Sequence, residues 1–129
     1  MDTSAWLALN DRNDQYYKQS AIKISLVKKQ KIELVTSEYI FDESITLIRH
    51  RVSHRHAVIF GDSLLNSNMV EIVDVNADCR LKAWEMFKKY EDKELSFTDC
   101  TSFVLMKDMR LHKAFTFDEH FRQVGVEIF

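Results

Sequence analysis

The chain has 129 residues, of which 46% are hydrophobic and 29% charged, and its net charge is −2. These values are typical of one globular domain with a core of its own. The slightly negative charge argues against a protein that coats nucleic acid without regard to sequence, which needs a strong basic excess. No apolar run is long enough to cross a bilayer and no signal-peptide pattern is present, so we expect a cytoplasmic protein with reduced cysteines.

Apolar periodicity and capping residues predict helices that alternate with short strands. The predicted elements are a helix capped by Thr3 or Ser4, a helix from Asp14 to about Gln30, a strand over 33–36, a helix from Ser37 to about Ser53, a helix over 56–66, a strand over 70–73, a helix capped by Asn76, a helix capped by Thr98, and strands over 114–117 and 126–129. Such alternation is typical of a parallel sheet. We therefore predict one α/β domain, residues 1–129, in which a parallel-stranded central sheet is flanked by helices in three layers, α/β/α.

Four acids stand out against this arrangement, because sites in parallel sheets gather at the carboxyl ends of the strands. Asp118 closes a predicted strand, and Asp2 would close a first strand before it. Asp99 lies in the first turn of a helix, and Glu43 lies beside the buried stripe of its helix. Capping of the helix is the alternative role for Asp99.

Carboxylates gathered at one place repel one another, by roughly 4 kcal/mol per pair at 4 Å and an effective dielectric near 20. A fold keeps such a group when protons or a cation neutralise it. Oxygen ligands without histidine or cysteine suit Mg²⁺ or Mn²⁺, and these ions activate water and stabilise charge on a phosphoryl oxygen.

Four segments in this order resemble the PIN-domain ribonucleases, and most closely the VapC-type toxins of bacterial and archaeal toxin–antitoxin pairs. They are Asp2–Trp6, Thr36–Ser44, Ser96–Asp99 and Ala114–Phe121, and the resemblance covers essentially the whole chain. No single segment is specific, but the ordered set is.

The resemblance implies that Asp2, Glu43, Asp99 and Asp118 hold Mg²⁺ or Mn²⁺ as catalytic residues. It also implies that the hydroxyls of Thr3, Thr98 and Thr116 support these acids. The activity implied is endonucleolytic cleavage of RNA by a metal-activated water. A homodimer and a small antitoxin protein are the implied partners.

The sequence departs from this family before the first acid. Members carry several apolar residues there, which form the central strand, whereas only Met1 precedes Asp2. Either the natural start lies upstream of Met1, or the first strand is truncated at the N-terminus; we favour the upstream start.

The densest basic stretch is 50–56, which includes Arg51 and Arg55. A cation-rich helix end explains it most simply. Arg51 and Arg55 are the candidates for contact with RNA phosphates. A zinc pair of His50 and His54 is a further alternative, although no third ligand is near in sequence.

Two other functions stay open. One is a catalytically silent PIN-like module that binds RNA or a protein partner. The other is a phospho-receiver domain, which would need paired acids after the first strand and a lysine after the last. Asp2 has no acidic neighbour and no such lysine is present, so this function is disfavoured.

Overall fold

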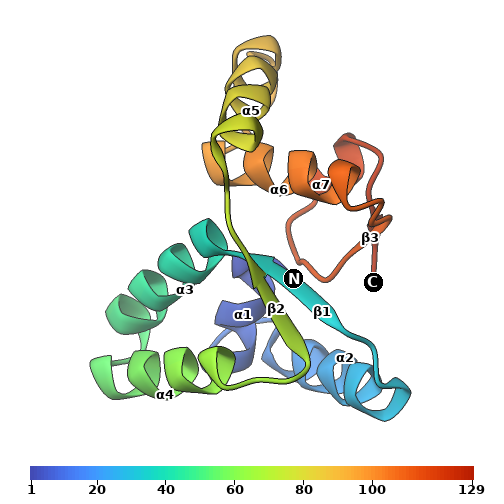
Figure 1. The fold of residues 1–129 in the computed structure, drawn as a ribbon. Coiled ribbons are helices and arrows are strands. Elements are labelled where there is room, and N and C mark those ends of the chain that lie inside the picture. Colours follow the sequence, from blue (N-terminus) through green and yellow to red (C-terminus); the bar gives the residue numbers. More distant parts are fainter.

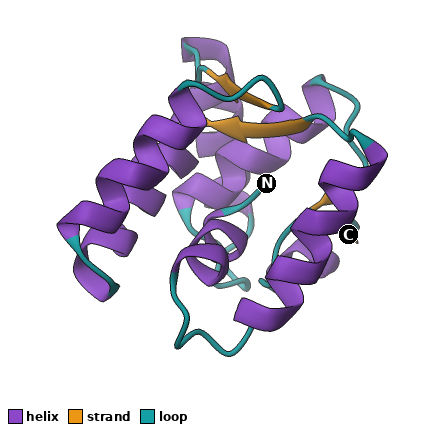
Figure 2. Cartoon of the chain, turned by 90° about the horizontal axis from the view of Figure 1, so that it is seen from below, coloured by secondary structure: helices purple, strands orange, loops and turns teal.

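The computed structural model describes residues 1–129. Its seven helices and four strands are α1 Thr3–Asn10, α2 Tyr17–Gln30, β1 Leu34–Ser37, α3 Glu38–Arg51, α4 His54–Leu65, β2 Val70–Val73, α5 Ala77–Lys89, α6 Phe97–Asp108, β3 Lys113–Ala114, α7 His120–Gln123 and β4 Glu127–Ile128. The prediction of an α/β fold with parallel strands flanked by helices is confirmed (Figure 1, Figure 2). None of the helices combines the length and apolar character that a membrane span requires.

The strands form two parallel pairs in place of the single sheet that was predicted. β1 pairs with β2 from Leu34 opposite Val70 to Ser37 opposite Val73. β3 pairs with β4 over two residues in each strand, so the predicted strands at 114–117 and 126–129 were too long. The two pairs share no strand-to-strand hydrogen bonds. Residues 1 and 2 lie between them: the Met1 nitrogen donates to Val35 O of β1, and Asp2 N donates to Phe115 O after β3 (Figure 1).

Two predicted helix caps are wrong. Asp2, in extended conformation, caps α1 by accepting a hydrogen bond from Ser4 N, so the cap precedes the predicted Thr3 or Ser4. Ser96 caps α6, and Thr98 is already the second residue of that helix. The Ser96–Asp99 spacing forms a capping box, in which each side chain accepts from the other residue's backbone N–H. Because the cap is Ser96 rather than Thr98, Asp99 is the third residue of the helix, and its side chain accepts from the backbone N–H of the cap.

Other helix starts follow the sequence more closely. The caps predicted at Ser37 and Asn76 are confirmed, each side chain accepting from the backbone N–H three residues later. The helix expected from His56 begins at His54, after Ser53 as its cap. The helix expected from Asp14 is an exception: Asp14 accepts from Tyr16 N, but α2 begins at Tyr17 with Tyr16 as its cap, and no side chain caps it.

The buried core divides between two halves of the molecule (Figure 1). The first half holds α1–α4, β1 and β2, and the second holds α5–α7, β3 and β4. The largest buried side chains of the first half are those of Trp6, Ile40, Ile48, Phe60 and Leu64. Those of the second half are Leu95, Phe103 and Phe121, with Cys79 and Cys100 as free buried thiols. A third, small cluster of Ala5, Val27 and Phe115 joins the halves.

Candidate active site

Asp2 lies buried, with 7% of its surface exposed, at the point where the two halves meet. Its Oδ2 accepts hydrogen bonds from Ser4 N at 3.1 Å, Ser4 Oγ at 2.7 Å and Thr116 Oγ1 at 2.9 Å. Thr116 follows β3, so this carboxylate is held from both halves at once. Its position is fixed by hydrogen bonds rather than by an ion pair.

Asp118 is attached to the same network through the backbone. Its N–H donates to Thr116 Oγ1 at 3.0 Å, and the preceding Phe117 N–H donates to Ser4 Oγ at 2.9 Å. On the other side, Asp118 Oδ1 accepts from His120 N at 2.9 Å and lies 2.9 Å from His120 Nδ1. The segment from Thr116 to His120 is therefore folded around this carboxyl group.

Asp99 lies in the first turn of α6, where Oδ2 accepts from Ser96 N at 2.8 Å and from Ser96 Oγ at 2.7 Å. Burial raises the pKa of the Asp99 carboxyl, and the negative charges of Asp2 and Asp118 raise this pKa further, against the lowering effect of the Ser96 hydrogen bonds. The charges of Asp2 and Asp118 therefore both act on Asp99.

Glu43 approaches this group from α3. Its Oε2 accepts from Thr3 Oγ1 at 2.5 Å, and Thr3 is the neighbour of Asp2. Glu43 also lines an open hollow together with Tyr39, Thr46, Leu47 and Thr98. Each acid therefore comes from a different part of the chain, while the hydrogen bonds converge on one region.

The predicted hydroxyl roles differ in outcome. Thr3 donates to Glu43 and Thr116 donates to Asp2. Thr98 does not support Asp99 by a hydrogen bond; its carbonyl accepts from Thr101 Oγ1, and Ser96 takes the place that was predicted for it. That prediction was wrong because two hydroxyl residues precede Asp99, and the capping-box spacing selects the first of them.

Sequence reasoning also missed Ser4. Its hydroxyl donates to Asp2, lies 3.1 Å from Thr116 Oγ1 and accepts from Phe117 N. The signal was available locally, because a serine two residues after an aspartate commonly donates its N–H to that carboxylate at a helix start. The long-range contacts with 116–117 were not available from the sequence.

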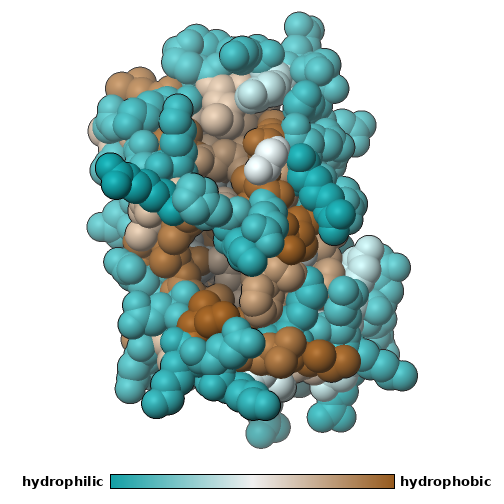
Figure 3. All heavy atoms as spheres, turned by 90° about the vertical axis from the view of Figure 1, so that its right-hand side faces the viewer, coloured by the Kyte–Doolittle hydropathy of each residue, from teal (hydrophilic) through white to brown (hydrophobic).

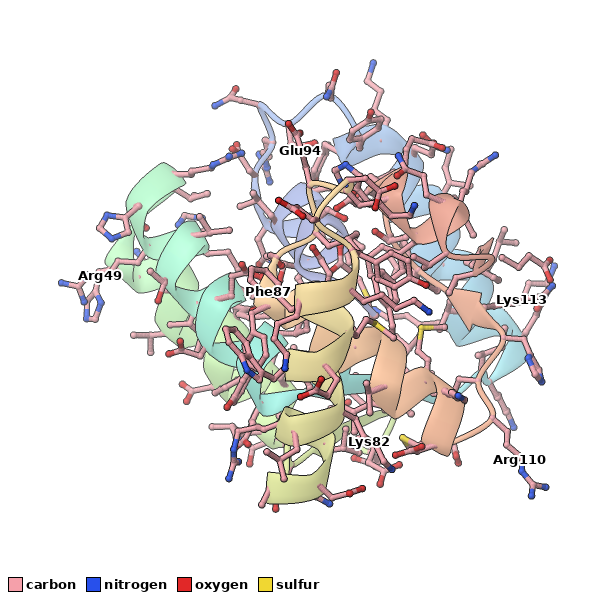
Figure 4. The ribbon with its side chains drawn as sticks, turned by 90° about the horizontal axis from the view of Figure 1, so that it is seen from above. Arg49, Lys82, Phe87, Glu94, Arg110 and Lys113 are labelled. Carbon is pink, nitrogen blue, oxygen red and sulfur yellow. The ribbon has the colours of Figure 1, made fainter.

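No basic side chain of the protein neutralises this region. Asp2, Glu43 and Asp99 form no ion pair with lysine or arginine, and His120 is the sole salt-bridge partner of Asp118. Arg49, Arg110 and Lys113 point outward from the surface (Figure 4). Uncompensated carboxylates with only oxygen donors suit a hard divalent cation. The side chains are not preassembled, since no three histidine, cysteine or acidic groups stand ready to hold a metal.

The basic stretch lies away from these acids. Arg51 is eight residues beyond Glu43 on α3, which places it about 12 Å further along the helix axis. Arg51 and Arg55 are both exposed and unpaired, so their contact with RNA stays a prediction. The zinc alternative for His50 and His54 gains no third ligand, and Arg49 Nη1 lies 3.0 Å from His54 Nδ1.

Comparison with known proteins assigns the family. Residues 1–127 match the family model of the PIN domain. The chain is a PIN-domain protein. It is 33% identical over 125 residues to the 23S rRNA-specific endonuclease VapC20 of Mycobacterium tuberculosis, covering 97% of this chain and 92% of that protein. It is 26% identical over 123 residues to a VapC ribonuclease of Archaeoglobus fulgidus, covering 94% of this chain and 77% of that protein.

The PIN fold is supported independently by three-dimensional similarity. The crystal structure of M. tuberculosis VapC20, described as a sarcin–ricin loop cleaving toxin, matches this chain with a TM-score of 0.87 at 30% identity, over 97% of this chain and 93% of that one. The resemblance and fold predicted from the sequence are thereby confirmed.

Proposed function

We propose that this PIN-domain protein is an endoribonuclease that depends on Mg²⁺ or Mn²⁺, and that it is the toxin of a toxin–antitoxin pair. The observation that carries the proposal is the convergence of acids on Asp99: the charges of Asp2 and Asp118 both raise the pKa of Asp99, and no lysine or arginine pairs with any of the three. The VapC names of the relatives support an RNA substrate.

In this proposal hydrogen bonds orient the acids individually before the ion and the substrate bind. Ser4 and Thr116 hold the Asp2 carboxylate, and Thr3 orients Glu43. The hydrogen bonds from Ser96 favour the ionised form of Asp99. When bound, the divalent ion supplies an activated water and positive charge beside the scissile phosphate.

The resemblance also bears on the partners and the cellular location of the protein. Since the chain resembles the VapC toxins, we infer a homodimer, a small cognate antitoxin protein and a cytoplasmic location. Ribosomal RNA is the first substrate to test, because VapC20 is named for its action on 23S rRNA.

The test is incubation of purified protein with large-subunit ribosomal RNA and Mg²⁺ or Mn²⁺. We expect site-specific cleavage that a chelator abolishes and that Asp118→Asn reduces at least about 100-fold, since metal catalysis contributes several kcal/mol. The matched control is Asp78→Asn, which removes an exposed carboxylate paired with Lys82 and should leave cleavage unchanged.

Two results would contradict the proposal. Cleavage that persists undiminished in Asp118→Asn would place the chemistry elsewhere. RNA or protein binding without cleavage by the parent chain, with either metal, would instead favour the catalytically silent module.

A further inference from the structure

Two aromatic rings stack face to face beside the candidate site. The ring centres of Tyr16 and Phe117 are 4.5 Å apart, and the ring planes differ by 2°. Tyr16 lies just before α2, whereas Phe117 lies between β3 and α7, so the pair connects the two halves of the molecule. β3 and α7 lie on the side that Figure 3 shows, where hydrophobic atoms are exposed among hydrophilic ones. A flat ring presented at the surface is a group on which a nucleobase can stack.

The backbone of Phe117 ties this ring pair to the acids. Phe117 N donates to Ser4 Oγ at 2.9 Å, and the same hydroxyl donates to Asp2 Oδ2 at 2.7 Å. Asp118 is the next residue, so its Cα atom lies about 3.8 Å from that of Phe117. The hydrogen bonds that orient Asp2 therefore also fix the ring pair, and a phosphate held at these acids brings its neighbouring base alongside the rings.

Tyr16 is the outer member of the pair. Phe117 packs edge to face against the buried Phe115, with ring centres 6.1 Å apart. Tyr16 is 36% exposed, and Phe117 is the one aromatic ring that covers it. The backbone of Tyr16 is held by Asp14, whose Oδ1 accepts from Tyr16 N at 2.8 Å. The pair is thus backed by the core, and the outer face of a positioned ring is left open to a ligand.

Positive charge accompanies the rings. Lys23 Nζ lies 5.4 Å from the centre of the Phe117 ring and 5.7 Å from that of Phe115. Burial lowers the pKa of Lys23, and the charge of Arg122 lowers this pKa further, so a second cation acts on the same place. Cations beside an exposed ring suit the phosphates on either side of a stacked base.

We propose that Tyr16 and Phe117 form a stacking platform for one unpaired base of the RNA substrate, next to the phosphate that is cleaved. Proteins that bind unpaired RNA commonly stack its bases on aromatic side chains. Since every base has a flat face, the platform positions the strand and does not read its sequence. The inference rests on the proposed ribonuclease function, because it takes RNA as the substrate.

The first experiment measures binding of RNA hairpins to the Asp118→Asn protein, which should cleave them slowly. Each hairpin carries 2-aminopurine, whose fluorescence falls on stacking, at one position of its unpaired loop. We expect Tyr16→Leu in this protein to weaken binding about 10-fold and to abolish the fluorescence decrease at one loop position, because leucine keeps an apolar side chain and lacks the ring. Tyr16→Phe keeps the ring and should retain both.

The matched control is Tyr90→Leu. The Nζ atoms of Lys89 and Lys93 lie 5.8 Å and 5.2 Å from the centre of the Tyr90 ring, so this tyrosine also has cations beside it. No hydrogen bond joins Tyr90 to the acids. The same substitution there should leave the affinity for the hairpins unchanged.

Removal of one base separates stacking from support of the fold. A hairpin that lacks the responding base, with its ribose and phosphates kept, should bind the Asp118→Asn protein about 10-fold more weakly than the intact hairpin does. Once Tyr16→Leu is added, the two hairpins should bind equally. If Tyr16→Leu weakens binding of both hairpins by the same factor, Tyr16 supports the fold alone and the proposal is overturned. Undiminished binding by Tyr16→Leu, or no binding of any hairpin before that change, overturns it too.

Cleavage kinetics keep this inference distinct from the proposed function. With Asp118 intact, Tyr16→Leu should raise the KM for RNA about 10-fold and leave kcat nearly unchanged, because stacking binds the substrate before and during the reaction alike. Cleavage by Tyr16→Leu with an unchanged KM would remove the platform and leave the ribonuclease function standing. Base-dependent binding by a chain that cleaves no RNA would support the platform and contradict the ribonuclease function.

Discussion

The double role of Asp99 gives the sharpest prediction. Its carboxylate completes the capping box with Ser96, and the charges of Asp2 and Asp118 raise its pKa. Asp99→Asn keeps an oxygen that can accept from Ser96 and removes the charge, so the melting temperature should stay within about 2 °C. Asp99→Ala loses the box as well, which costs about 1 kcal/mol and lowers the melting temperature by about 4 °C.

Ribonuclease activity should separate from stability in this pair. We expect both variants to lose at least about 100-fold in cleavage rate, because both lack the charge that would hold the divalent ion. Ser96→Ala is the converse control, since it weakens the cap and keeps the carboxylate: it should melt about 4 °C lower and retain most of its activity. The assay is cleavage of the RNA under single-turnover conditions, with thermal unfolding followed by circular dichroism. Wild-type cleavage by Asp99→Asn would refute the reasoning and leave this residue a cap alone.

Further predictions follow from neighbouring groups. Thr3→Val removes the hydrogen bond to Glu43 and should weaken Mn²⁺ binding about 10- to 100-fold by calorimetry, whereas unchanged affinity would exclude an orienting role for Thr3. Because burial raises the pKa of Asp99, acidification should protonate it, and weaken Mn²⁺ binding, at a higher pH than for an exposed aspartate near 3.9. Without metal the sign reverses for stability: the raised folded-state pKa stabilises the fold below the unfolded-state pKa, and this contribution is lost as pH rises through the folded-state pKa. Burial, with the charge of Asp99, raises the pKa of the Cys100 thiol to about 11, so iodoacetamide should label it slowly at pH 8 in the folded protein and rapidly in urea. Rapid labelling of the folded state would show that Cys100 is accessible.

The positions of the acids were accessible from the sequence to different degrees. Asp118 follows a short apolar run and Glu43 lies beside an apolar helical stripe, so local patterns already pointed to these two acids, whereas Asp2 was singled out by the family resemblance. Their roles as metal ligands remain predictions. The network through Ser4 could not be foreseen, because it joins residues 113 positions apart.

Strand lengths show the same limit. The runs at 114–117 and 126–129 are apolar and favour extended structure, but a ladder forms only where a partner edge exists. Phe115 bonds to Asp2 instead of to a long strand, so β3 ends at Ala114. The caps at Ser37 and Asn76 were predictable because a cap bonds within its own first turn.

The distribution of the four acids has a mechanical consequence. Asp2 and Glu43 belong to the first half of the molecule, whereas Asp99 and Asp118 belong to the second. An ion bound by all four would hold the two halves together, in addition to the hydrogen bond from Thr116 Oγ1 to Asp2 Oδ2. Closing the halves and binding the ion then become linked equilibria, so each strengthens the other.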